Sequence, residues 1–72
     1  MVSFGECLHH AARTPALVAE FDRLQGSHLS TLDGRTPLDA MIDDATARHR
    51  DDVLAFAAFV FHAVYLPLNP AD

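Results

Sequence analysis

A carboxylate and two imidazoles stand close together near the amino end of the chain, at Glu6, His9 and His10. Glu6 and His9 have the i, i+3 spacing that carboxylate-bridged di-metal bundles use for their ligands. Such a site also needs a second pair on another helix, which a symmetric dimer would supply from its partner chain. The competing interpretation is a solvent face with weak side-chain contacts. A metal or small-ligand carrier is therefore the second hypothesis, and we predict no bound cofactor.

Two further groups contain residue types that can act as nucleophiles. Cys7 lies one turn from His10, but its thiol falls on the apolar face and the imidazole on the opposite one, which favours an inert buried thiol. Ser27 and His28 share a hydroxyl-rich segment with Asp33, yet no nucleophile-elbow or oxyanion pattern positions them. Turn chemistry explains these residues, and we assign no catalytic residue.

Five of the six acidic residues of the second half have the spacing of a solvated helical face. They are Asp39, Asp43, Asp44, Asp51 and Asp52. A calcium loop would need alternating oxygen ligands around a glycine outside a helix, and this segment has no glycine. The sequence also lacks the paired cysteines of a zinc site and the glycine-rich loop of a phosphate site. These patterns favour a role other than that of an enzyme.

The elements that would position these residues are all helices. Ser3 and Glu6 have the spacing of a capping box. Thr14 followed by Pro15 is a second helix start, and Gly26 stands where a left-handed residue would end that helix. The predicted fold is an all-α bundle of three to four short helices in a single domain over 1–72. The predicted helices are at about 3–12, 15–25, 37–48 and 52–66, with a frayed tail at 67–72.

The connections between these helices are less regular. Residues 27–35 lose the helical periodicity, so we expect a loop with a turn at Asp33–Gly34. No Pro or Gly interrupts residues 38–66, which leaves open one helix of about 30 residues. Typical helix lengths favour two helices with a short break at 47–52, the first of them capped at Thr36–Pro37. Pro67 is expected to end the last helix, because its ring clashes with the preceding turn.

The last helix is apolar on two nearly opposite sides. One stripe consists of Val53, Phe56, Val60 and Val64, and the other of Leu54, Ala58, Phe61 and Tyr65. A chain of 72 residues has few helices with which to cover both sides. Exposed apolar patches usually mark interfaces, and twofold dimers are the commonest soluble assembly. We predict a homodimer through the second stripe; the alternative is a central helix buried within its own chain.

The charge balance narrows the class of partner. Five Arg and no Lys against ten Asp and Glu give a net charge of −5, which disfavours binding to nucleic acid. Residues 37–72 hold two Arg and six Asp, so any electrostatic partner of this half is expected to be a basic protein.

Cysteine content and hydropathy bear on location. A lone Cys7 forms no internal disulfide, and the first six residues lack the pattern of a secretory signal. The longest apolar run, Val53 to Leu68, contains His62 and Pro67 and is shorter than the ~20 residues of a typical span. We therefore predict a cytoplasmic protein without membrane attachment. Its predicted function is that of a small soluble protein–protein interaction or regulatory module that self-associates through its last helix.

Overall fold

A computed structural model describes residues 2–32, 38–48 and 51–69 of the chain. It contains α1 (Phe4–Ala12), α2 (Pro15–Gln25), α3 (Leu29–Leu32), α4 (Leu38–Arg48), α5 (Asp51–Val60), the π-helix η1 (Phe61–Tyr65) and α6 (Leu66–Leu68). The predicted all-α class is confirmed, since the described residues form helices and no strand. The predicted cap at Thr36–Pro37 and the predicted turn at Asp33–Gly34 lie outside the described residues.

The first two helices begin and end close to the predicted positions, although one cap differs. The Ser3 hydroxyl accepts a hydrogen bond from the Glu6 amide at 3.1 Å, as a helix N-cap should. Thr14 does not cap α2 with its side chain, contrary to the prediction. Its hydroxyl instead donates at 2.8 Å to the His10 carbonyl in the last turn of α1, which also accepts from the Arg13 amide at 3.2 Å. Gly26 ends α2 in the left-handed region at φ 67°.

The predicted loop over 27–35 is wrong in part, because Leu29–Leu32 forms the one-turn helix α3. Asp22 supplies the physical reason. Its carboxylate accepts hydrogen bonds from the amides of Leu29 at 2.7 Å and Ser30 at 2.9 Å, which satisfies free N–H groups at the start of that turn. Because Asp22, seven residues before Leu29, stabilises α3, this helix needs no periodic apolar pattern, and the sequence shows none there.

Residues Asp51–Leu68 form one continuous helix, of which η1 is the middle part. The prediction that Pro67 ends this helix is wrong, because residues 67 and 68 are helical; residues 70–72 of the predicted tail lie outside the described residues. In η1 the Leu66 amide donates to the Phe61 carbonyl, one residue further back than in an α-helix. This wider turn lies directly before Pro67, where the proline ring would otherwise meet the preceding carbonyl. The helix therefore continues to Leu68, and Asn69 donates to the Tyr65 carbonyl at 2.9 Å.

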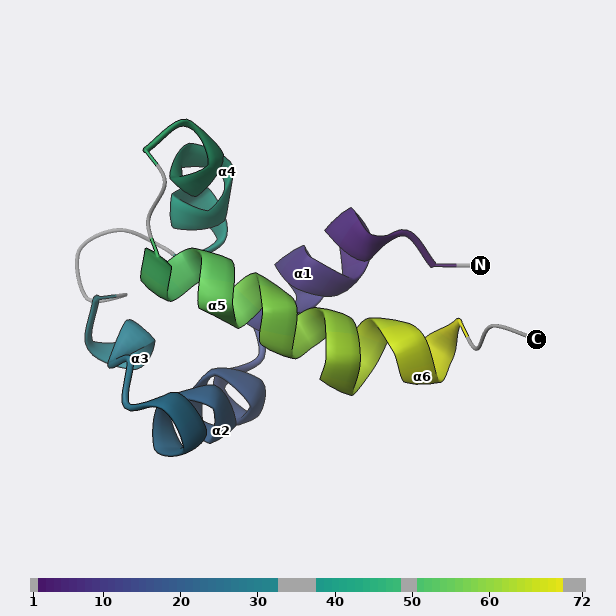
Figure 1. Cartoon of the computed structure of the whole chain (residues 1–72), viewed down its shortest axis with the longest axis horizontal. Helices are drawn as coiled ribbons and strands as arrows, with labels where there is room; N and C mark the ends of the chain where they lie inside the picture. The colour runs from purple at the N-terminus through teal and green to yellow at the C-terminus, as the bar shows by residue number, and fades with distance from the viewer. Residues whose placement is uncertain (1, 33–37, 49–50, 70–72) are drawn as a thin grey trace.

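Two separate helices occupy the second half of the chain, as predicted, with residues 49–50 outside the description. In Figure 1 the long helix formed by α5, η1 and α6 crosses the molecule, while α4 stands beside its beginning and runs in another direction. The helix α1 packs along α5 and η1 and also touches α4. Helix α2 lies on the side of α5 away from α4 (Figure 1).

The core forms where the inner side of the last helix meets the other helices. The largest fully buried side chains are Phe21, Phe56, Leu29, Leu38, Val53 and Val60. The rings of Phe21 and Phe56 meet edge to face at 5.2 Å between centroids, which ties α2 to α5. The first predicted stripe of the last helix is thus buried as expected at Val53, Phe56 and Val60. Cys7 is also buried.

Candidate functional site

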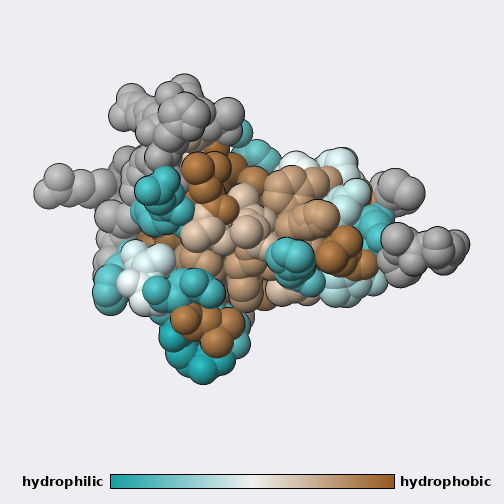
Figure 2. All heavy atoms as spheres, in the orientation of Figure 1, coloured by the Kyte–Doolittle hydropathy of each residue, from teal (hydrophilic) through white to brown (hydrophobic). Residues whose placement is uncertain are grey.

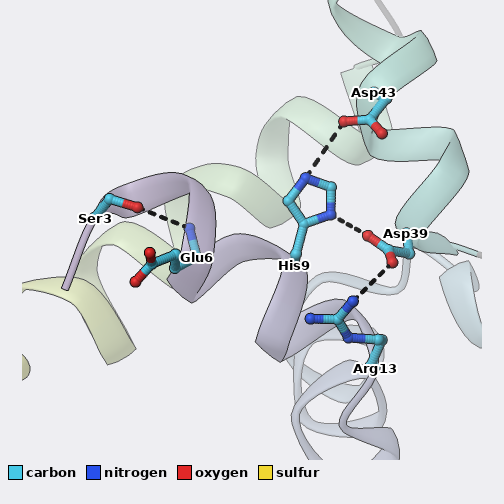
Figure 3. A network of polar contacts seen from close by, with 6 residues as sticks. All are labelled: Ser3, Glu6, His9, Arg13, Asp39 and Asp43. Atoms are coloured by element: carbon cyan, nitrogen blue, oxygen red, sulfur yellow. Dashed lines mark hydrogen bonds and ion pairs between the residues drawn. The ribbon is translucent and has the colours of Figure 1, made fainter.

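His9 contacts two carboxylates of α4, and Figure 3 shows the arrangement. Its Nδ1 contacts Asp39 Oδ1, and its Nε2 lies 3.3 Å from Asp43 Oδ1. Arg13, which follows directly after α1, places Nη1 3.1 Å from Asp39 Oδ2. We call His9, Arg13, Asp39 and Asp43 the His9 cluster. It is the main polar contact described between α1 and α4.

The structure does not bring the predicted metal candidates together. The Glu6 carboxylate points away from the His9 ring (Figure 3), and the His10 side chain is exposed. The two ring nitrogens of His9 face different aspartates on opposite sides of the imidazole, so Asp39 and Asp43 do not converge with it on one point. Among the described residues, no group of three or more His, Cys, Asp or Glu side chains could hold a metal ion.

Sequence reasoning missed the partners of His9, although a signal was present. His9 and Arg13 are four residues apart, and so are Asp39 and Asp43. Each pair therefore lies on one face of its helix, and the two faces carry opposite charges. The spacing indicates two matching faces but does not say which helices pack together.

Within the His9 cluster, the folded structure shifts the pKa of the Asp39 carboxyl. The hydrogen bond with His9 lowers the pKa of the Asp39 carboxyl below its usual value, and the nearby charges of His9 and Arg13 act in the same direction. Partial burial opposes this shift and is outweighed. The carboxylate form is thus the one that the folded protein stabilises.

The remaining sequence candidates have structural roles or lie apart. The Ser27 hydroxyl donates to Asp22 at 2.7 Å, and the exposed His28 adopts a positive φ of 61°. Asp33 lies outside the described residues. Cys7 is 2% exposed, whereas His10 on the same helix is exposed, so thiol and imidazole are separated as predicted.

The outer side of the last helix carries several exposed apolar residues. We call Leu54, Ala55, Ala58, His62 and Leu66 the outer face. Leu54 is 45% exposed and Leu66 is 39% exposed, and the other three residues are exposed as well. Figure 2 shows a largely apolar band along this helix. Within the predicted interface, Leu54 and Ala58 are thus open to solvent.

Phe61 and Tyr65, the other two predicted interface residues, are half-buried against α1. The Phe4 ring lies 5.7 Å from the Phe61 ring and 5.8 Å from the Tyr65 ring, between centroids. Both residues belong to the π-helix η1, at its first and last positions. A π turn takes one residue more than an α turn, so the residues that follow it are set back by about 100° around the axis.

The last helix also meets the length and hydropathy of a membrane span. Over Asp51–Leu68 the mean hydropathy is 1.5, and 17% of the residues are buried. Core helices of soluble proteins can meet the same criteria. Here Val53, Phe56 and Val60 supply the buried part, and they pack within the chain's own core.

A hollow of about 390 Å³ lies beside the His9 cluster, where α1, α2, α3 and α4 approach one another. Its lining consists of Ala12, Arg13, Pro15, Val18, Ser30, Leu38 and Asp39. The polar groups in this lining are already engaged, Arg13 with Asp39 and Ser30 with Asp22. The hollow therefore defines no class of ligand.

These features define a small all-α bundle with one incompletely covered helix. No protein-family model, curated protein or solved structure matches the chain. The functional argument accordingly rests on the residues themselves.

Proposed function

We propose that this protein is a small interaction module that self-associates by pairing its outer face with the outer face of a second copy. One observation carries the proposal. The 18-residue helix Asp51–Leu68 buries Val53, Phe56 and Val60 on its inner side and leaves apolar residues open on its outer side. Water contact with this surface is unfavourable, and a partner that covers it gains the corresponding hydrophobic free energy.

The distribution of charge is compatible with a second copy as that partner. Two copies of a protein with net charge −5 repel each other unless their contact surface is free of charge. Residues 53–69 contain no Asp, Glu, Lys or Arg, so pairing along this segment brings no formal charges together. His62 is the one side chain of the outer face that can become charged.

An antiparallel twofold arrangement suits the helix best. It places Asp51 and Asp52 of the two copies at opposite ends of the paired helices. An 18-residue helix is about 27 Å long, well beyond the ~8 Å over which salt screens exposed charges at physiological ionic strength. A parallel pair would bring the four aspartates together. The alanines at 55 and 58 allow the two helix axes to approach at the short end of the usual 8–10 Å range.

The size of the outer face sets the expected affinity. Stable protein interfaces bury about 800 Å² per partner, and a strip of one helix about 27 Å long offers less. We therefore expect a dissociation constant in the micromolar range, corresponding to about −8 kcal/mol. This range suits a module whose assembly responds to its concentration.

A lipid surface is the competing occupant of the same face. The side of the helix that packs on α1 and α2 is occupied by aromatic contacts, so only the outer strip is free to meet lipid without unfolding the bundle. The described residues beside that strip carry Asp51 and Asp52 and no cation that would attract anionic headgroups. We therefore propose a protein partner and not a lipid surface. This proposal agrees with the cytoplasmic location predicted from the sequence.

Sedimentation velocity at 5–200 µM tests the proposal with two matched variants. Ala58→Glu places a charge at the centre of the outer face, and Ala19→Glu places the same charge on an exposed alanine of α2. We expect the wild type and Ala19→Glu to form dimers with the same affinity. Ala58→Glu should remain a monomer over the whole range, because a buried unpaired carboxylate costs several kcal/mol.

A monomeric wild type at 200 µM would contradict the proposal, as would equal dimerisation of both variants. Circular dichroism of each variant checks that the helices are retained. Flotation with neutral phosphatidylcholine vesicles tests the other occupant. Wild-type protein that floats with the vesicles and is monomeric in solution, together with loss of flotation in Ala58→Glu, would favour lipid over a second copy.

A further inference from the structure

The His9 ring has an acceptor at each of its two nitrogens. Nδ1 contacts Asp39 Oδ1 and Nε2 lies 3.3 Å from Asp43 Oδ1. A neutral imidazole has one N–H donor and one bare nitrogen, whereas an ionised carboxylate offers acceptors only. A neutral His9 would therefore turn a lone pair toward one of the two aspartates. The imidazolium form donates to both.

The charges of the His9 cluster balance in that form. The imidazolium and the Arg13 guanidinium face two carboxylates, which gives a local sum of zero. With His9 neutral the sum is −1, and Asp43 loses its described partner. The groups that face the ring are Asp39 and Asp43 from α4 and Arg13 from α1, while the Glu6 carboxylate is turned away (Figure 3). The side chains of His9 and Asp39 are 30% and 32% exposed, so solvent screens their contact incompletely.

We infer that His9 is an imidazolium in the folded protein and acts as a proton-dependent clamp that fastens α4 to α1. Loss of the proton removes the donor to Asp43 and leaves two carboxylates beside a single guanidinium. Because α4 also packs through Leu38, Met41, Ile42 and Ala45, the result is a looser α4 and not an unfolded chain. The inference concerns the contact between α1 and α4 and does not depend on self-association through the outer face.

The direction of the pH effect follows from the two kinds of group. The imidazolium donates to both aspartates only while it holds both protons, so its contribution to stability is present at low pH and is lost when a rise in pH removes one of them. The contact also fails in strong acid, when Asp39 takes up a proton. Because the pKa of Asp39 lies below the ordinary carboxyl value of 3.8, the folded protein keeps this carboxylate charged to lower pH. The clamp is thus closed in mild acid and opens toward alkaline pH.

Correlation of the ring nitrogens with their attached carbon protons by NMR tests the protonation state directly in the wild type. This experiment distinguishes the imidazolium from both neutral tautomers. At pH 7.0 we expect the pattern of two protonated nitrogens for His9, with the exposed His10 of the same helix as internal reference. A His9 spectrum of a neutral tautomer at pH 7.0 would overturn the inference, and this result needs no variant to fold.

Thermal unfolding of three variants tests the clamp itself. Between pH 6.0 and 8.5, the midpoint of the wild type should fall by about 2–5 °C more than that of His9→Gln, a size expected of a partly exposed ion pair. His10→Gln should follow the wild type. In Asp43→Asn most of this additional decrease of the midpoint should be absent, because the amide of the new side chain can donate to a neutral ring nitrogen of His9. Equal pH profiles for wild type, His9→Gln and Asp43→Asn would contradict the clamp.

Discussion

Asp22 shows how much one side chain can organise in this chain. Its carboxylate accepts hydrogen bonds from the hydroxyl groups of Ser27 and Ser30 and from the amides of Leu29 and Ser30. Burial by itself would raise the pKa of Asp22, but these four hydrogen bonds lower it to about 2. Asp22 thus fixes the corner between α2 and α3 through its ionised form.

Asp22→Asn is expected to remove this acid-sensitive contribution. With a folded pKa of about 2 against an ordinary value of 3.8, the contribution is complete above pH 5 and is lost as the pH falls toward 2. We expect the variant to be less stable by about 1–2 kcal/mol at pH 7, and this difference should shrink on acidification. Urea unfolding at pH 7, 4 and 3 measures it.

Glu6→Gln provides the control, since the Glu6 side chain is exposed and the described residues donate no hydrogen bond to its carboxylate. It should change stability by less than about 0.5 kcal/mol at each pH. A pH-independent loss in Asp22→Asn would show that the carboxylate charge does not hold the corner.

The last helix illustrates how a local irregularity redirects a whole element. The π turn at Phe61–Tyr65 rotates the residues after it, and among these Asn69 lies against Val2. The Asn69 side chain accepts from the Val2 amide at 3.0 Å and donates to the Val2 carbonyl at 3.1 Å. The end of the last helix is thereby fastened to the segment before α1.

Pro67→Ala should allow the π turn to return to α-helical geometry, because the proline ring that the wider turn accommodates is gone. Residues after Tyr65 would then rotate by about 100° and Asn69 would leave Val2. Nuclear Overhauser contacts between Val2 and Asn69, present in the wild type, should disappear in the variant.

Asn69→Ala is the matched variant for this experiment. It removes the same pairing with Val2 but leaves Pro67 in place, so the contact between Phe4 and Tyr65 should persist. If Pro67→Ala keeps the contacts between Val2 and Asn69, then Pro67 is not what maintains the π turn.

The molecule as a whole depends on a small core. With 72 residues, its expected free energy of unfolding is about 4–11 kcal/mol, so one large buried side chain is a substantial share. Phe56 is fully buried and contacts Phe21 and Phe59, which joins α2 to α5. Stability is therefore concentrated on the inner side of the helix whose outer side we propose as the interface.

Phe56→Ala should destabilise the monomer by about 3–5 kcal/mol, through lost burial and the cavity that remains. Leu24→Ala removes a side chain that is 53% exposed and should cost less than about 1 kcal/mol. Urea unfolding at a concentration below dimerisation measures both. Similar losses in the two variants would mean that Phe56 does not occupy the centre of the core.

Local sequence signals were sufficient for the bounds of α1 and α2 and for the inner side of the last helix. Ser3, Pro15 and Gly26 mark helix ends through backbone geometry and free amide groups, and these effects act within a few residues. The apolar stripe at Val53, Phe56 and Val60 identifies a core face for the same reason, since periodicity follows from helix geometry alone.

Features that join distant residues required the folded chain. Asp22 reaches α3 across a corner, His9 meets Asp39 from 30 positions away, and Asn69 meets Val2 from the other end. Sequence spacing shows which residues share a helix face, but the packing of one helix on another selects the partner face. The π turn also required the folded chain. It changes the register of the last helix in a way that α-helical periodicity does not predict, and Tyr65 and Asn69 contact the amino-terminal segment there.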